Sequence, residues 1–118
     1  MRSEIKLCHR MAMDFDELAE MLRDHEEFHH EILPYLFVGD VMRWYVTKWR
    51  TGDPVANRFA SWLEGEFVRG DHGTQNVIGV SFLEHLPSPS RKNPSDIAET
   101  FGPFLRNALE SLRQTRSE

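Results

Sequence analysis

Thr51-Gly52-Asp53-Pro54 separates two segments whose apolar residues recur at helical spacing. Glycine commonly follows a helix end, and Asp before Pro is a frequent start, with Asp as the N-cap and Pro at the first helical position. The spacing therefore predicts one helix over residues 41–50 and a second over residues 54–68. The apolar face of the second helix carries Val55, Phe59, Trp62, Leu63 and Phe67.

Toward the N-terminus, we expect a helix to begin at Asp14. Asp14 and Glu17, three residues later, resemble a capping box. Apolar residues follow at helical spacing up to Leu22, after which their positions shift. This shift predicts a kink or a new helix near Asp24-His25. The shifted apolar positions are Phe28, Ile32 and Leu36.

Two other acidic residues carry structural expectations. Asp40 is expected to cap the helix over residues 41–50. Glu66 projects near the middle of the apolar face of the 54–68 helix. Because a buried carboxylate needs a partner, we expect the helix end at Gly70 to let Glu66 reach water.

The C-terminal part of the chain is expected to be helical as well. Residues 76–86 are the most apolar segment and predict a buried helix, although the alternation from Ile78 to Phe82 also fits a strand. Residues 87–94 are expected to form a loop, and Gly102-Pro103 to divide a last helical region.

The composition favours one folded domain. The chain has 118 residues, of which 40% are hydrophobic and 28% charged, and its thirteen aromatic residues supply enough burial for a core. A single cysteine, Cys8, excludes an internal disulfide and is expected to be a small buried residue in a cytoplasmic protein. No apolar run has membrane-spanning length. We expect an all-α, single-domain bundle of about five to six helices over residues 1–118.

The net charge of −5 is unevenly placed. Residues 14–31 carry eight acidic side chains and one basic one, whereas the rest of the chain carries a net +2. This balance argues against nucleic-acid binding and favours a cationic protein partner. A solvated helix face is the alternative interpretation. The expected partner-binding residues are Asp16, Glu20, Asp24, Glu27 and Glu31.

Residues 25–29 read HEEFH, a match to the H-E-x-x-H pattern of zinc hydrolases. In such enzymes two histidines one helical turn apart bind the metal, and the glutamate is the general base. The flanks are charged, Pro34 limits the helix, and no motif supplies a third ligand. We expect no metal, no cofactor and no enzyme activity, with a zinc hydrolase using His25, Glu26 and His29 as the alternative. Third-ligand candidates are His30, Glu31, Glu64, Glu66, His72, Glu84 and His85.

Three strings support a family resemblance: ILPYLFVGDVMRW at 32–44, NVIGVSFLEHL at 76–86 and FGPFLR at 101–106. They resemble a group of small helical bacterial proteins over most of residues 30–112. Similar small acidic helical proteins serve as immunity proteins in polymorphic-toxin and contact-dependent inhibition systems. The resemblance implies an all-α fold and an immunity function, and no active-site residue can be carried over from it. Together with the charge distribution, it leads us to expect an immunity protein that covers the active site of a cationic toxin, such as a nuclease, with the acidic segment at 14–31. A helical adaptor or homodimer is a further alternative, and the oligomeric state stays open.

Overall fold

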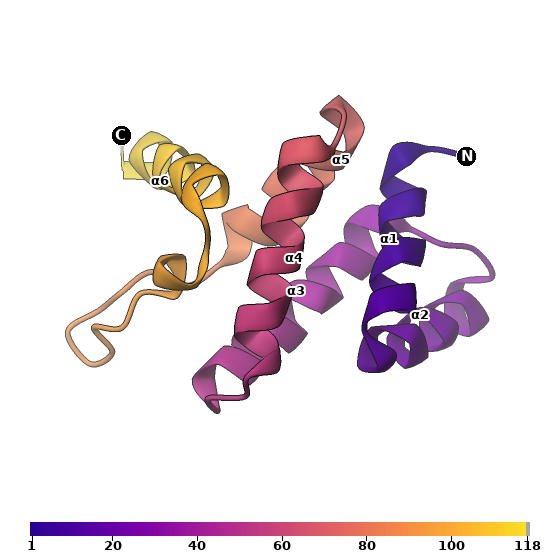
Figure 1. The fold of residues 1–118 in the computed structure, drawn as a ribbon, viewed down its shortest axis with the longest axis horizontal. Coiled ribbons are helices and arrows are strands. Elements are labelled where there is room, and N and C mark those ends of the chain that lie inside the picture. The colour runs from indigo at the N-terminus through magenta and orange to yellow at the C-terminus, as the bar shows by residue number, and fades with distance from the viewer. Residues whose placement is uncertain (118) are drawn as a thin grey trace.

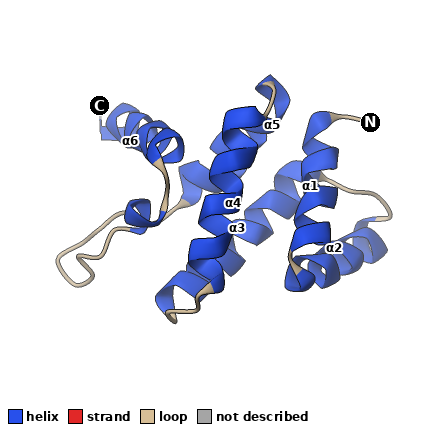
Figure 2. Ribbon diagram, in the orientation of Figure 1, coloured by secondary structure: helices blue, strands red, loops and turns tan. Residues whose placement is uncertain are grey.

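The computed structural model describes residues 1–117, which contain helices and loops and no strand (Figure 2). The expected all-α, single-domain fold is confirmed. Three short helical turns join the last two α-helices: a π-helical turn at Ile78–Phe82 and 3-10 turns at Leu83–His85 and Ile97–Thr100. The α-helices are α1 (Ser3–Asp14), α2 (Asp16–His29), α3 (Pro34–Arg50), α4 (Val55–Arg69), α5 (His72–Val77) and α6 (Pro103–Ser117).

Helices α3 and α4 cross at the centre of the molecule, with α1 and α2 on one side and α6 on the other (Figure 1). Helix α1 contacts α2, α3 and α5, and α4 contacts α3, α5 and α6. Apolar side chains from all six α-helices meet in one core. This arrangement leaves one long side of α2 facing solvent, at the edge of the bundle.

Phe59 on α4 lies at the centre of an aromatic cluster. It is fully buried, and its ring centroid lies 5.2–5.9 Å from five other rings. Such aromatic contacts contribute beyond the area they bury. Trp62 was expected in the core with Phe59, but it is only partly buried and packs against the edge of the core. The five neighbours of Phe59 are Phe15, Trp44, Tyr45, Trp62 and Phe82.

The turn predicted between α3 and α4 forms, although Pro54 rather than Asp53 is the N-cap residue and α4 begins at Val55, whereas the signal at Asp40 does not act as expected. Gly52 adopts a left-handed φ of 73°, and the Asp53 carboxylate accepts the Val55 N–H at 3.0 Å. Asp40 caps nothing, because α3 begins at Pro34 and continues through it. Proline is well suited to a first helical turn, where its missing N–H has no partner to lose. Asp40 lies within the helix, and its carboxylate pairs with Arg43.

The capping box predicted at Asp14 and Glu17 is wrong. Helix α1 ends at Asp14, the chain turns at Phe15, and α2 starts without a side-chain cap. The two carboxylates instead accept indole N–H groups from other helices. Asp14 accepts from Trp62 and Glu17 from Trp44, each at 2.6 Å. These partners lie far away in sequence, so the local pattern could not reveal them.

The kink predicted near His25 is also wrong, because α2 is continuous through it. The buried face of α2 runs from Leu22 to His25, so a histidine occupies the next core position. His25 and His29 share this face, with ring centroids 4.5 Å apart. The apparent shift of the apolar pattern arose because Phe28 and Leu36, taken as buried, are 79% and 46% exposed.

Glu66 is buried and ion-paired, so the expectation that it reaches water is wrong. It is 7% exposed, and its carboxylate accepts from Arg10 on α1 and from Arg69, the latter at 3.3 Å. Two guanidinium groups thus compensate the desolvation of one carboxylate. The pair with Arg10 links α1 to the end of α4.

The C-terminal part follows the sequence-based expectations closely. Residues 76–86 are helical throughout most of their length and contribute buried side chains to the core, which excludes the strand alternative. Residues 87–94 form the loop that projects from the bundle in Figure 1. Helix α6 begins at Pro103, and the Glu64 carboxylate of α4 accepts the Phe104 and Leu105 N–H groups at 2.8 and 2.9 Å.

Candidate protein-binding surface

The structure divides the acidic side chains of residues 14–31 into two groups. The first group is Asp14 and Glu17, which bind the indoles of Trp62 and Trp44. Glu17 also forms an ion pair with Lys48 at 3.1 Å. The Trp44 hydrogen bond, followed by that from Lys48, lowers the pKa of Glu17. These two carboxylates hold the α1–α2 corner against α3 and α4, so their role is structural.

The second group contains six carboxylates that lie exposed. Within residues 1–117 none of them makes a side-chain hydrogen bond or an ion pair, and the one basic residue among them, Arg23, makes none either. We call these six residues the acidic surface. They are Asp16, Glu20, Asp24, Glu26, Glu27 and Glu31. All five partner-binding residues expected from the sequence belong to it, and Glu26 is an addition.

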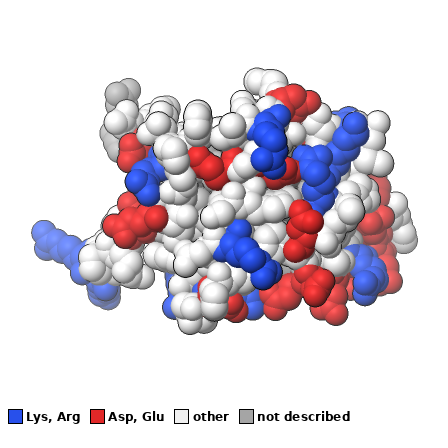
Figure 3. Space-filling model, viewed as in Figure 1, with Lys and Arg blue, Asp and Glu red and all other residues white. Residues whose placement is uncertain are grey.

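Helical geometry places most of the acidic surface on one side of α2. At about 100° per residue, four of its members fall within a sector of about 80°. The opposite side of the helix carries the buried residues Leu18, Leu22 and His25. Red side chains gather where Figure 1 places α2, at the lower right of Figure 3. The four residues are Asp16, Glu20, Asp24 and Glu27; Glu26 flanks them, and Glu31 follows the left-handed residue that ends the helix.

Phe28 is a large exposed aromatic side chain beside the acidic surface. It follows Glu27 and lies one helical turn beyond Asp24, and 79% of its surface is exposed. An exposed aromatic ring among charges is the kind of residue that anchors protein interfaces. The sequence pattern grouped Phe28 with Ile32 and Leu36 as shifted apolar positions and did not predict that it is exposed. The helical spacing of Leu18 and Leu22, continued to His25, would have placed Phe28 outside.

A shallow hollow of about 410 Å³ lies on α2 beside the acidic surface. Glu26 and Glu27 line it together with Ala19, Leu22 and Arg23. The acidic surface is therefore concave along one flank and carries an aromatic projection on the other. A partner can therefore be complementary to this surface in both charge and shape.

The chain matches the family described as "Domain of unknown function (DUF7674)" over residues 8–117. It belongs to this family. Neither the curated proteins nor the solved structures contain a match to this DUF7674 protein.

The HEEFH segment of the DUF7674 protein has a structural role at His25. This histidine is 6% exposed, and its Nε2 accepts the Leu33 N–H at 2.9 Å. Burial, and then the neighbouring His29, lower the pKa of His25, so the neutral acceptor form is favoured. This nitrogen is therefore occupied by the backbone. Among the described residues, no group of three or more His, Cys, Asp or Glu side chains is arranged to hold a metal ion.

Cys8 is a buried thiol in the DUF7674 protein. It is fully buried on α1, as expected from the sequence, and burial raises the pKa of its thiol to about 12. The thiol rather than the nucleophilic thiolate is then the form present near neutral pH.

No helix within residues 1–117 combines the length and the apolar character that crossing a bilayer requires.

Proposed function

We propose that this DUF7674 protein is an immunity protein that binds a cationic toxin and neutralises it by covering its active site with the acidic surface. The observation that carries this proposal is the set of six carboxylates on and beside α2 that form no side-chain hydrogen bond or ion pair within residues 1–117. A nuclease is a suitable target, because a site that holds phosphates is electropositive. The carboxylates of an acidic helix carry the same negative charge as the phosphates that such a site binds.

The acidic surface carries an energetic cost in the isolated protein. Asp16 and Glu20 are one helical turn apart, as are Glu20 and Asp24, and like charges at this spacing destabilise a helix by about 0.2–0.5 kcal/mol per pair. A helix that only needed solvation would gain from interleaved lysines, yet α2 contains only Arg23. A cationic partner relieves this repulsion on binding.

Phe28 supports a binding role over a purely solvated face. Hydration alone gives no reason to hold a phenyl ring 79% exposed among carboxylates. At an interface, a buried aromatic residue supplies affinity while neighbouring charges set association rate and specificity. The exposed ring and the acidic surface therefore support the same interaction.

The decisive experiment begins with capture of a partner, first with the product of the neighbouring gene and then from the source cell's lysate. Association kinetics are then measured at two salt concentrations. The double variant Asp24→Lys with Glu27→Lys should slow association by roughly 10–1000-fold at low salt and by less at high salt. The matched control is Glu99→Lys with Glu110→Lys, which makes the same charge change at exposed positions on the 3-10 turn and α6.

Two results would contradict the proposal. One is a tightly bound partner whose association rate is the same for wild type and the Asp24→Lys, Glu27→Lys variant and does not depend on salt. The interface would then lie elsewhere, and the acidic surface would be a solvated face. Failure to find a partner, together with hydrolysis of a substrate by the purified protein, would replace the binding function with an enzyme.

A further inference from the structure

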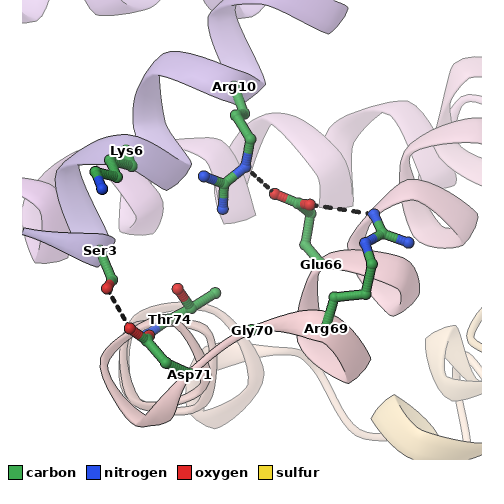
Figure 4. Close-up of a pocket in the computed structure, with 8 residues that line it drawn as sticks. All are labelled: Ser3, Lys6, Arg10, Glu66, Arg69, Gly70, Asp71 and Thr74. Carbon is green, nitrogen blue, oxygen red and sulfur yellow. Dashed lines mark hydrogen bonds and ion pairs between the residues drawn. The ribbon is translucent and has the colours of Figure 1, made fainter.

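A second polar hollow, of about 540 Å³, lies between α1, the end of α4 and the start of α5 (Figure 4). Three cationic side chains line it: Lys6 and Arg10 from α1, and Arg69 from α4. It shares no residue with the acidic surface. Its chemistry is also opposite, because basic groups outnumber acidic ones among its lining residues.

Glu66 holds two of these cations in place. It accepts from Arg10 through the guanidinium Nε, and from Arg69 through Nη2. This leaves the two terminal nitrogens of Arg10 without a protein partner in the described chain, and Figure 4 shows them pointing away from Glu66 toward the hollow. A guanidinium edge of this kind presents two parallel donors, which match a carboxylate or a phosphate.

Lys6 adds a positive charge that no described residue pairs with. Its ammonium group makes no hydrogen bond or ion pair with the rest of residues 1–117. In Figure 4 it lies on the same side of the hollow as Arg10, one helical turn away on α1. An anion between them would meet two positive groups held on one rigid helix.

The second carboxylate of the hollow, Asp71, is already engaged. It accepts from the Ser3 hydroxyl and, at 3.0 Å, from the Thr74 N–H. The hydrogen bond from Ser3 is the largest cause of a lowered pKa at Asp71, which keeps it ionised. Three cations and two carboxylates give the hollow a formal net charge of +1, and its unused donors are on Lys6 and Arg10.

We propose that this hollow is a binding site for a small oxyanion, the carboxylate or phosphate group of a small molecule, held by Lys6 and the terminal nitrogens of Arg10. The site is independent of the proposed immunity function, because it involves other residues on another side of the bundle. Arg69 contributes positive charge at the rim, where its side chain is 72% exposed.

The test is a titration followed by two-dimensional amide NMR, with inorganic phosphate in one series and acetate in another, at ionic strength held constant with chloride. We expect saturable shifts at the amides of Lys6, Gly70 and Thr74. The series that saturates at lower concentration identifies the preferred oxyanion. Lys6→Met should weaken binding roughly tenfold, the size expected for losing one charge-assisted hydrogen bond.

Lys92→Met is the matched control, since it removes an exposed lysine from the loop at residues 87–94 and should leave binding unchanged. Lys6→Met spares the pair between Arg10 and the buried Glu66, and an unchanged melting temperature would show that the fold is retained. Absence of saturable shifts with both anions would overturn the site. So would equal weakening by Lys6→Met and Lys92→Met, since that pattern indicates general charge screening.

Discussion

The Nε2 atom of His25 accepts the backbone N–H of Leu33 at 2.9 Å and so joins α2 to the turn that leads into α3. Only the neutral imidazole can accept through this atom, because a protonated imidazole donates from both nitrogens. The ring lies against Phe37 of α3, with centroids 5.6 Å apart. One histidine thus supplies both a core contact and a link between two helices.

This link makes stability depend on pH. Burial and His29 lower the pKa of His25 in the folded state, whereas Asp40 and Glu26 oppose this effect. The unfolded chain therefore takes up a proton more readily near its ordinary pKa of about 6.5. The stabilisation from His25 is fully present above that pH and is lost as the pH falls through the folded pKa. Urea unfolding from pH 8 to pH 5 measures it.

His25→Gln is the variant that tests this assignment. Glutamine has an acceptor oxygen but no titration, so it should flatten the part of the pH dependence that His25 causes. His72→Gln, at an exposed position at the start of α5, is the control and should retain the wild-type curve. Equal curves for wild type and His25→Gln would show that other groups cause the dependence.

Phe28→Ala should separate binding from folding. Because the ring is 79% exposed, we expect the free energy of unfolding to change by less than about 0.5 kcal/mol. Loss of an aromatic anchor should weaken partner binding by about 2 kcal/mol, or roughly thirtyfold, mainly through faster dissociation. Phe104→Ala, which removes an exposed ring from α6, should not affect binding. Equal affinities for Phe28→Ala and wild type would remove Phe28 from the interface.

Phe59 and Trp62 should differ in what they contribute to stability. Phe59→Ala opens a cavity at the centre of the aromatic cluster and should cost about 3–5 kcal/mol. Trp62→Ala should cost less, because Trp62 is partly exposed. Trp62→Phe keeps a ring and loses only the hydrogen bond to Asp14, so about 1 kcal/mol is expected. Denaturant unfolding of all three variants gives the ranking, and a larger loss for Trp62→Ala than for Phe59→Ala would contradict it.

Natively purified protein should contain no stoichiometric zinc. The reason is the bond from Leu33 to His25, which occupies one ring nitrogen of the H-E-x-x-H segment. Elemental analysis after purification without chelators measures this directly. About one zinc per chain that disappears in His29→Ala would restore the hydrolase alternative.

Much of the fold is encoded by short-range signals. The φ of Gly52 and the hydrogen bond from Val55 to Asp53 involve residues within a few positions of one another, so the end of α3 and the start of α4 are predictable from the local sequence. The helical spacing of α4 and the division at Gly102-Pro103 are equally local. The acidic surface was also foreseeable in part, since net charge needs no knowledge of packing.

The sequence-based predictions that were wrong concern polar residues whose partners lie on other helices. Asp14 and Glu17 match the sequence pattern of a capping box. Their carboxylates instead accept hydrogen bonds from Trp62 on α4 and Trp44 on α3. Glu66 was expected to reach water, yet α1 brings Arg10 to it. A carboxylate can accept hydrogen bonds from water, from the local backbone or from a distant side chain. The packing of segments far apart in sequence decides which of these donors is in contact with it.

The sequence by itself determined that this chain forms a helical bundle with a strongly acidic segment, because helical periodicity, turn residues and charge are properties of neighbouring positions. Only the tertiary structure decided which members of that segment are free. It assigned two carboxylates to indole partners, left six in solvent, and placed His25 rather than Phe28 in the core. The physical reason is that burial and pairing depend on which helix faces cross, and those crossings join residues dozens of positions apart.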